Sequence, residues 1–261
     1  MAPLGPYVYD LATAATKDMH DAFRDFGMES KKNALLAISL VGFVPTLSIL
    51  MTLLVIDGEL ASQAFFILCK AWLLFIPTYW FLRVEGNPIS WSPSDKNGIF
   101  EGVVTGVAMS VIIFVVWMVL GDSIDTESMV EQLQNTGLTS IEVYVAGMFY
   151  WIFLNSMLEE YVFRWFITVK GIELTGSESG GIIVSALMFT LHHALALHLF
   201  GFEWWQTGIA CFGLISAAAI WSWLYIRHRS IWVCWISHAI CDVAVFAIGY
   251  QLVFNLSLIH I

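Results

Sequence analysis

Long uninterrupted runs of apolar residues dominate the chain, and short polar segments separate them. A helix needs about 20 apolar residues to cross the hydrocarbon core of a bilayer. The runs are continuous and do not alternate every second residue, as the strands of a transmembrane β-barrel would. We therefore predict an all-α, polytopic membrane protein. Its expected spans are residues 33–56, 60–82, 102–120, 141–165, 182–201, 204–226 and 231–254.

Composition narrows the function classes further. Of the 261 residues, 59% are hydrophobic and 12% are charged, whereas soluble domains carry about 25% charged residues. A soluble enzyme and a disordered chain are therefore excluded. The formal net charge is −10, and nucleic-acid binding depends on lysines and arginines that neutralise phosphates. We therefore expect a lipid bilayer and no nucleic acid as a partner.

The basic residues give the expected orientation. Ten of the 11 lysines and arginines fall in segments that share one side of the membrane. The loops on the opposite side contain aspartates and glutamates but no lysine or arginine. The positive-inside rule makes the basic side cytoplasmic. We therefore expect a multi-pass protein of the cell (inner) membrane with a cytoplasmic N-terminus and an outer C-terminus. The ten are Lys17, Arg24, Lys31, Lys32, Arg83, Lys96, Arg164, Lys170, Arg227 and Arg229.

We divide the chain into three segments. Residues 1–32 have apolar positions at helical spacing, which indicates a cytoplasmic amphipathic helix. Residues 33–140 hold three spans, and residues 141–261 hold four. Lys70 is the eleventh basic residue and lies in the middle of the second span. It is expected to snorkel or to pair with an acid from another helix.

The fourth span carries polar residues that cannot face lipid. Glu160 and Arg164 are four residues apart, as are Asn155 and Glu159, so each pair can meet on a helix. We expect Arg164 and Lys170 to end this span. Two adjacent carboxylates beside one arginine leave one carboxylate uncompensated, and such a group suits general-base catalysis.

Two other spans carry ionisable residues at comparable depth. His192 and His193 lie in the fifth span, while His238 and Asp242 lie four residues apart in the seventh. Buried ionisable residues in membrane spans mark functional sites by default. Because all three polar clusters lie in the cytoplasmic half of the bilayer or near its middle, we predict one shared site.

This pattern resembles the CPBP family of CAAX prenyl endopeptidases (type II) and bacteriocin-processing proteases, also called Abi proteins. The family motifs are E-E-x-x-x-R, F-x-x-x-H and H-x-x-x-N/D. This sequence matches them in the family order, one per span, over about residues 141–250. The matching residues are Glu159, Glu160 and Arg164, then Phe189 and His193, then His238 and Asp242.

The resemblance implies helices around a polar, water-filled intramembrane cavity and glutamate-dependent peptide hydrolysis. Glu159 with His193 would activate the attacking water, although the adjacent His192 could take that role. By the same resemblance His238 and Asp242 would be the oxyanion-stabilising pair. Glu160 would shape the site with Arg164, and Asn155 and Phe189 would support it.

The chain departs from the family pattern at two positions. Glycine is common after the motif arginine, but this chain has Trp165, and a bulky indole there would alter access from the cytoplasmic interface. The third motif ends in Asp242, where asparagine is frequent. An ionised carboxylate cannot donate to an oxyanion, so we expect Asp242 to orient His238.

Several alternatives remain open at this stage. We expect a membrane-associated peptide or protein substrate and no cofactor, with zinc at the glutamate–histidine cluster as the lesser alternative. An inactive scaffold or immunity protein of the same fold would carry the same residues. Buried glutamates, histidines and a lysine also occur in proton-coupled transporters.

Overall fold

Membrane-length helices make up almost all of the structure. The computed structural model describes residues 28–89, 91–92, 96–125, 130 and 140–254, and every regular element in them is helical. Within this part of the chain, seven helices are long and apolar enough to cross a membrane, so the predicted all-α membrane fold is confirmed. They are Met28–Val55, Glu59–Val84, Gly98–Ser123, Ile141–Thr175, Glu178–Leu199, Trp204–His228 and Ile231–Phe254. Most of the expected amphipathic segment, residues 1–27, lies outside the described residues.

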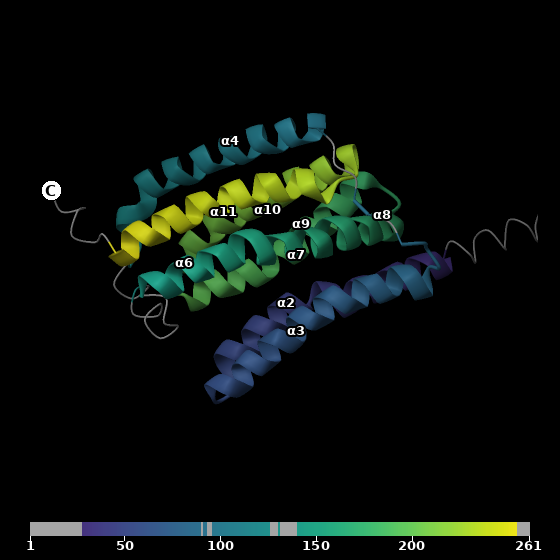
Figure 1. Ribbon diagram of the computed structural model, residues 1–261, viewed down its shortest axis with the longest axis horizontal. Helices are drawn as coiled ribbons and strands as arrows, with labels where there is room; N and C mark the ends of the chain where they lie inside the picture. The colour runs from purple at the N-terminus through teal and green to yellow at the C-terminus, as the bar shows by residue number, and fades with distance from the viewer. Residues whose placement is uncertain (1–27, 90, 93–95, 126–129, 131–139, 255–261) are drawn as a thin grey trace, which may run out of the picture.

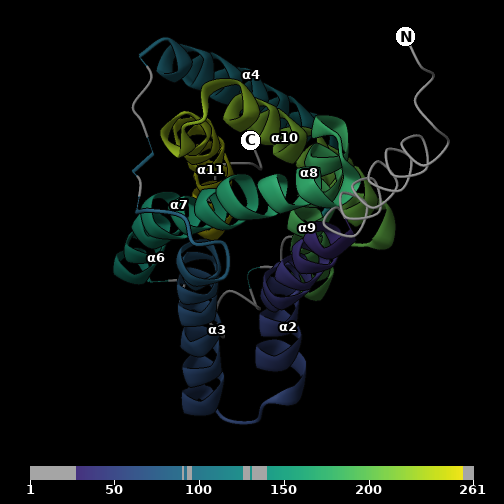
Figure 2. The same cartoon turned by 90° about the vertical axis from the view of Figure 1, so that its right-hand side faces the viewer.

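The helices form a main bundle and a projecting hairpin. In the bundle, α4 (Lys96–Leu120) packs along α11 (Ile231–Phe254), and α9 (Glu178–Leu199) packs along α10 (Trp204–His228). The hairpin consists of the Met28–Val55 helix, which ends in α2 (Val44–Leu50) and η1 (Met51–Val55), followed by α3 (Glu59–Tyr79) and η2 (Trp80–Val84). Figure 2 shows α2 and α3 side by side, extending away from the bundle.

The fourth spanning helix changes its winding along its length. It runs through α6 (Ile141–Phe149), η4 (Tyr150–Asn155), α7 (Ser156–Glu159), η5 (Glu160–Thr168) and α8 (Val169–Thr175). Both η4 and η5 are π-helical, and the hydroxyl of Thr168 accordingly donates to the carbonyl of Phe163, five residues back. π-Helical turns are rare and concentrate at functional sites. The 3.6-residue periodicity assumed from the sequence therefore does not hold next to the two glutamates.

The same helix extends ten residues past its predicted end at residue 165. Arg164 does not end the span, because its side chain is fully buried inside the bundle. Burial is tolerated because Arg164 pairs with Glu160 and lies against aromatic rings. Lys170 lies near the true end and pairs with Glu85 and Glu173.

Close contact between α4 and α11 sets the position of the seventh span. Gly106 lies so near α11 that a Cβ atom there would come within 2.8 Å of the carbonyl oxygen of Ser237. Ser110, one turn further along α4, donates to the carbonyl of Ile240 at 3.1 Å. Small residues at such spacing let membrane helices approach closely. This packing holds the part of α11 that carries the third motif.

A tight turn joins the fourth and fifth spans. Gly176 adopts the left-handed conformation (φ 76°) after α8, and the Ser177 hydroxyl caps α9 by accepting from the Gly180 amide at 3.0 Å. Glycine is the residue that adopts this conformation without strain. Gly171 and Gly181 then let α8 and α9 meet closely, so the helices carrying the first two motifs run side by side.

Candidate active site

The three motif helices bring their ionisable side chains into one cluster. From α11, His238 contacts both glutamates of the fourth span: its Nδ1 lies 2.8 Å from Glu160 Oε1, and its Nε2 lies 3.8 Å from Glu159 Oε2. From α9, His192 Nε2 lies 3.7 Å from Glu159 Oε1. His193 of the second motif belongs to the same group, so residues of all three predicted motifs lie around Glu159.

Glu160 and Arg164 form the buried base of the cluster. Both side chains are fully buried, and Arg164 Nε lies 3.2 Å from Glu160 Oε2. The other carboxylate oxygen, Oε1, accepts a hydrogen bond from Nδ1 of His238. Because Glu160 is enclosed on all sides, it cannot meet a substrate or bulk water. Its geometry fits a residue that fixes the His238 ring.

Aromatic rings enclose the Arg164 guanidinium. Its central carbon lies 4.8 Å from the ring centroid of Phe189 and 5.2 Å from that of Trp221. Such contacts stabilise a desolvated cation by about 2 kcal/mol. Phe189 also contacts His193 (centroids 4.4 Å apart) and His238 (5.8 Å). The phenylalanine of the second motif therefore packs against the arginine and against both histidines.

Glu159 differs from Glu160 in being accessible. Its side chain is 13% exposed, and Asn155 donates from Nδ2 to its Oε1 at 2.9 Å. The predicted pairing of these two residues on one helix face is therefore present. Of the two adjacent glutamates, Glu159 is the one without an arginine partner among the described residues, and a water molecule could reach its carboxylate.

The two adjacent histidines of α9 face Glu159 in different ways. His193 donates from Nδ1 to its own helix at the Phe189 carbonyl (2.9 Å), which leaves Nε2 as the acceptor nitrogen. His192 is buried and stacks on Phe163, with centroids 5.6 Å apart and planes at 14°. One nitrogen of each histidine and one oxygen of Glu159 all lie within 4.8 Å of one another.

Asp242 sits at the exposed edge of the cluster. Its side chain is 23% exposed, and Oδ1 lies 3.5 Å from His238 Nε2. That separation is longer than a hydrogen bond. The hydrogen bond of the His238 ring is instead donated to Glu160 from the opposite nitrogen, while Asp242 lies within ion-pairing distance of Nε2, and its orienting role stays a prediction.

Trp221 is a site residue that the motifs do not reveal. Its ring stacks on His238 with centroids 4.1 Å apart and planes at 18°. The indole Nε1 donates to the Ser237 hydroxyl at 3.1 Å, which fixes the ring. The signal in the sequence is a tryptophan that lies inside a span, seven residues before the end of α10, since membrane tryptophans otherwise gather at the interfaces.

The same cluster offers a donor set for a metal. Glu159, His192 and His193 supply the oxygen and nitrogen ligands that zinc takes in catalytic sites with three protein ligands. Donors on one tetrahedral zinc ion lie about 3.3 Å apart, given bonds of about 2.0–2.1 Å. The three donors would have to close in from their present spacing to hold such an ion.

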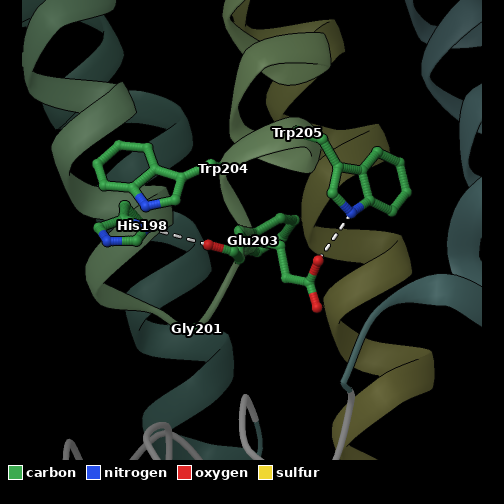
Figure 3. Close-up of a pocket in the computed structure, with 6 residues that line it drawn as sticks. His198, Gly201, Glu203, Trp204 and Trp205 are labelled. Atoms are coloured by element: carbon green, nitrogen blue, oxygen red, sulfur yellow. Dashed lines mark hydrogen bonds between the residues drawn. The ribbon is translucent and has the colours of Figure 1, made fainter.

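The surface hollows lie apart from the motif cluster. An open hollow of about 560 Å³ lies where α9 ends and α10 begins. Figure 3 shows the residues that line it, with the His198 ring stacked on Trp204 and Trp205 bonded to Glu203. A second hollow, of about 240 Å³, lies at the opposite end of the bundle, and Trp165 lines it with Phe81 and Tyr225. No motif residue lines either hollow, so neither is a candidate for the chemistry.

One family model matches part of the chain. Residues 141–244 match the sequence model of the type II CAAX prenyl endopeptidase Rce1-like family, which agrees with the resemblance carried by the motifs. The matched region contains every motif residue and excludes the first three spans. No curated protein and no solved structure matches the chain.

Proposed function

We propose that this chain, whose residues 141–244 match the Rce1-like family model, is an intramembrane glutamate-dependent endopeptidase. Its substrate would be a membrane-associated protein or peptide. The observation that carries the proposal is the environment of Glu159. This accessible carboxylate faces the imidazoles of α9 on one side and His238 Nε2 on the other.

The geometry supports a hydrolysis in two proton-transfer steps. A water held by Glu159 and by Nε2 of His193 loses a proton to the carboxylate as its oxygen attacks the peptide carbonyl carbon. The carbonyl π electrons move onto the oxygen, which becomes an oxyanion. Collapse of this intermediate breaks the C–N bond, and Glu159 returns its proton to the departing amine nitrogen. Such acid–base catalysis contributes about 10²–10⁴-fold to a rate.

His238 is the proposed oxyanion-stabilising group. Because Nδ1 donates to Glu160, the ring is held with Nε2 directed toward Glu159 and Asp242. In the imidazolium form Nε2 carries a proton and can donate to the oxyanion. Preorganised donors of this kind typically contribute about 10²–10³-fold. Asp242, at the exposed edge, would supply negative charge that favours this form.

The proposed direction of substrate entry follows from the basic residues. Lys170, Arg227 and Arg229 lie at the end of the bundle where α8 and α10 terminate, and the positive-inside rule makes that end cytoplasmic. His238 lies seven residues into α11, about 10 Å from that helix end at 1.5 Å per residue. We therefore propose that the substrate reaches the site from the cytoplasmic half of the bilayer.

The proposal is tested by comparing protein termini in membranes of the native host. Wild type, Glu159→Gln and Glu178→Gln would be expressed at equal levels, with Glu178 chosen because it is an exposed acid at the start of α9. We expect one or more uncleaved precursors to accumulate with Glu159→Gln alone. Identical termini in all three strains, with the variants well folded, would overturn the protease proposal and favour a scaffold.

A further inference from the structure

A lysine in the hairpin reaches the catalytic cluster. Lys70 lies in the middle of α3, and its Nζ donates to Oδ1 of Asn155 at 2.5 Å. Asn155 in turn donates from Nδ2 to Oε1 of Glu159 at 2.9 Å. A chain of two hydrogen bonds therefore runs from an ammonium group in the second span to the proposed general base in the fourth. The family match does not include α3.

Snorkelling does not account for Lys70. It lies 11 residues after Glu59 and 14 before Val84, where the spanning helix ends, so the two helix ends are about 16 and 21 Å away at 1.5 Å per residue. That is farther than a lysine side chain extends. A charged residue at this depth costs at least about 2.5 kcal/mol on insertion scales, so the contact with Asn155 must compensate for much of that cost.

The lysine fixes which way the asparagine amide faces. An ammonium group only donates hydrogen bonds, whereas an amide has one accepting oxygen and one donating nitrogen. With Lys70 in place, the oxygen of Asn155 must face the ammonium, and the NH₂ group must face Glu159. Without the lysine the amide oxygen loses its partner, and the Asn155 side chain is held by its bond to Glu159 alone, so it can take other rotamers and carry the carboxylate with it.

We propose that Lys70 is a positioning residue that acts through Asn155 to hold the Glu159 carboxylate in its reactive orientation. This inference rests on the proposed function. It also gives the α2–α3 hairpin a role, because the hairpin supplies the group that sets the general base. Lys70 makes no hydrogen bond or ion pair with Glu159 among those described, so the amide of Asn155 is the hydrogen-bonded link between them, in addition to the through-space attraction of the two charges.

The proposal predicts a specific kinetic pattern. Lys70→Met should lower kcat by about tenfold to a hundredfold, as expected when a hydrogen bond to a charged group is lost. KM should change by less than about threefold, because Lys70 does not touch the substrate. Lys70→Arg, which keeps the donor, should recover most of the rate. Lys32→Met removes an exposed lysine of the first spanning helix and should leave kcat unchanged.

A double-mutant cycle separates positioning from general structural support. Lys70→Met, Asn155→Ala and the double variant would be purified in detergent, and kcat would be measured on a precursor found by the terminus comparison. If the lysine acts through the asparagine, the double variant should be no slower than the slower single variant. Additive losses, an effect on KM alone, or full activity of Lys70→Met would each overturn the proposal.

The cycle also keeps the two proposals distinguishable. Thermal unfolding of the wild type, the two single variants and the double variant measures the Lys70–Asn155 coupling without any substrate. Failure of the wild type to cleave any precursor would reject the proposed function, and the inference about Lys70 would fall with it. Cleavage by the wild type together with independent effects of Lys70 and Asn155 would reject only this inference.

Discussion

His238 and Glu160, 78 residues apart in the sequence, share a hydrogen bond of 2.8 Å inside the bundle. This bond joins the first motif to the third and leaves the opposite nitrogen of His238 facing Glu159. The two adjacent glutamates are thereby divided in role. The buried Glu160 accepts the hydrogen bond of the His238 ring, and the accessible Glu159 is the proposed general base.

This division predicts opposite consequences for the two glutamates. Glu160→Ala leaves Arg164 as an unpaired buried cation, and breaking a buried pair costs about 3–5 kcal/mol. We expect a marked fall in the thermal unfolding temperature in detergent. Glu159→Gln should abolish cleavage and change stability by less than about 1 kcal/mol, because glutamine keeps the shape of the side chain and an oxygen that can accept from Asn155. Equal stability losses in both variants would contradict the assignment.

Trp221 should matter for the reaction although it lies outside the motifs. Trp221→Leu removes the surface on which the His238 ring stacks and leaves the Ser237 hydroxyl without its indole donor. We expect kcat to fall by at least about tenfold, since misplacement by about 1 Å can cost a hundredfold. Trp223→Leu, two residues away and 45% exposed, is the matched control. Equal kcat values for the two variants would remove Trp221 from the site.

The aspartate at the end of the third motif can be tested by an exchange that keeps its shape. Because Glu160 supplies the hydrogen bond to His238, Asp242→Asn should retain cleavage within about tenfold of wild type, and its amide could itself donate to an oxyanion. Asp242→Ala should be slower than Asp242→Asn. Complete loss of activity in a well-folded Asp242→Asn protein would show that a carboxylate is required.

The sequence predicted the seven-helix fold and the meeting of the motif side chains in one site. It did not predict the π-helical turns or the role of residues outside the motifs, such as Trp221. Continuous apolar runs gave seven spans because lipid tolerates little else in a helix. The polar residues of three spans could be expected to meet, since none can face lipid. The π-helical turns around Glu159, the burial of Arg164 and the stacking of Trp221 depend on packing across helices, which no periodicity along one helix reports.

Helix packing far from the chemistry should also control activity. Gly106→Val would place side-chain atoms against the backbone of α11 at Ser237, where even a Cβ atom would be too close. We expect α11 to move and kcat to fall, with a lower unfolding temperature. Gly213→Val on α10, where a Cβ atom would have nothing within 4 Å, keeps the helix-propensity change similar. Equal kcat values for the two variants would show that α4 does not set the position of His238.

Metal dependence separates the two chemistries that the cluster permits. In the proposed mechanism Glu159 and His193 act on water directly, so dialysis against a strong chelator should leave the cleavage rate unchanged. A zinc site would need Glu159, His192 and His193 together, and apo-protein would regain activity when zinc returned.

His192→Phe adds a discriminating measurement, because it removes one of the three metal donors and keeps a ring that can stack on Phe163. Chelator-sensitive, zinc-restored cleavage that disappears in His192→Phe would replace the metal-free mechanism. Chelator-resistant cleavage that persists in His192→Phe and is lost in His193→Phe would assign the water-activating imidazole to His193.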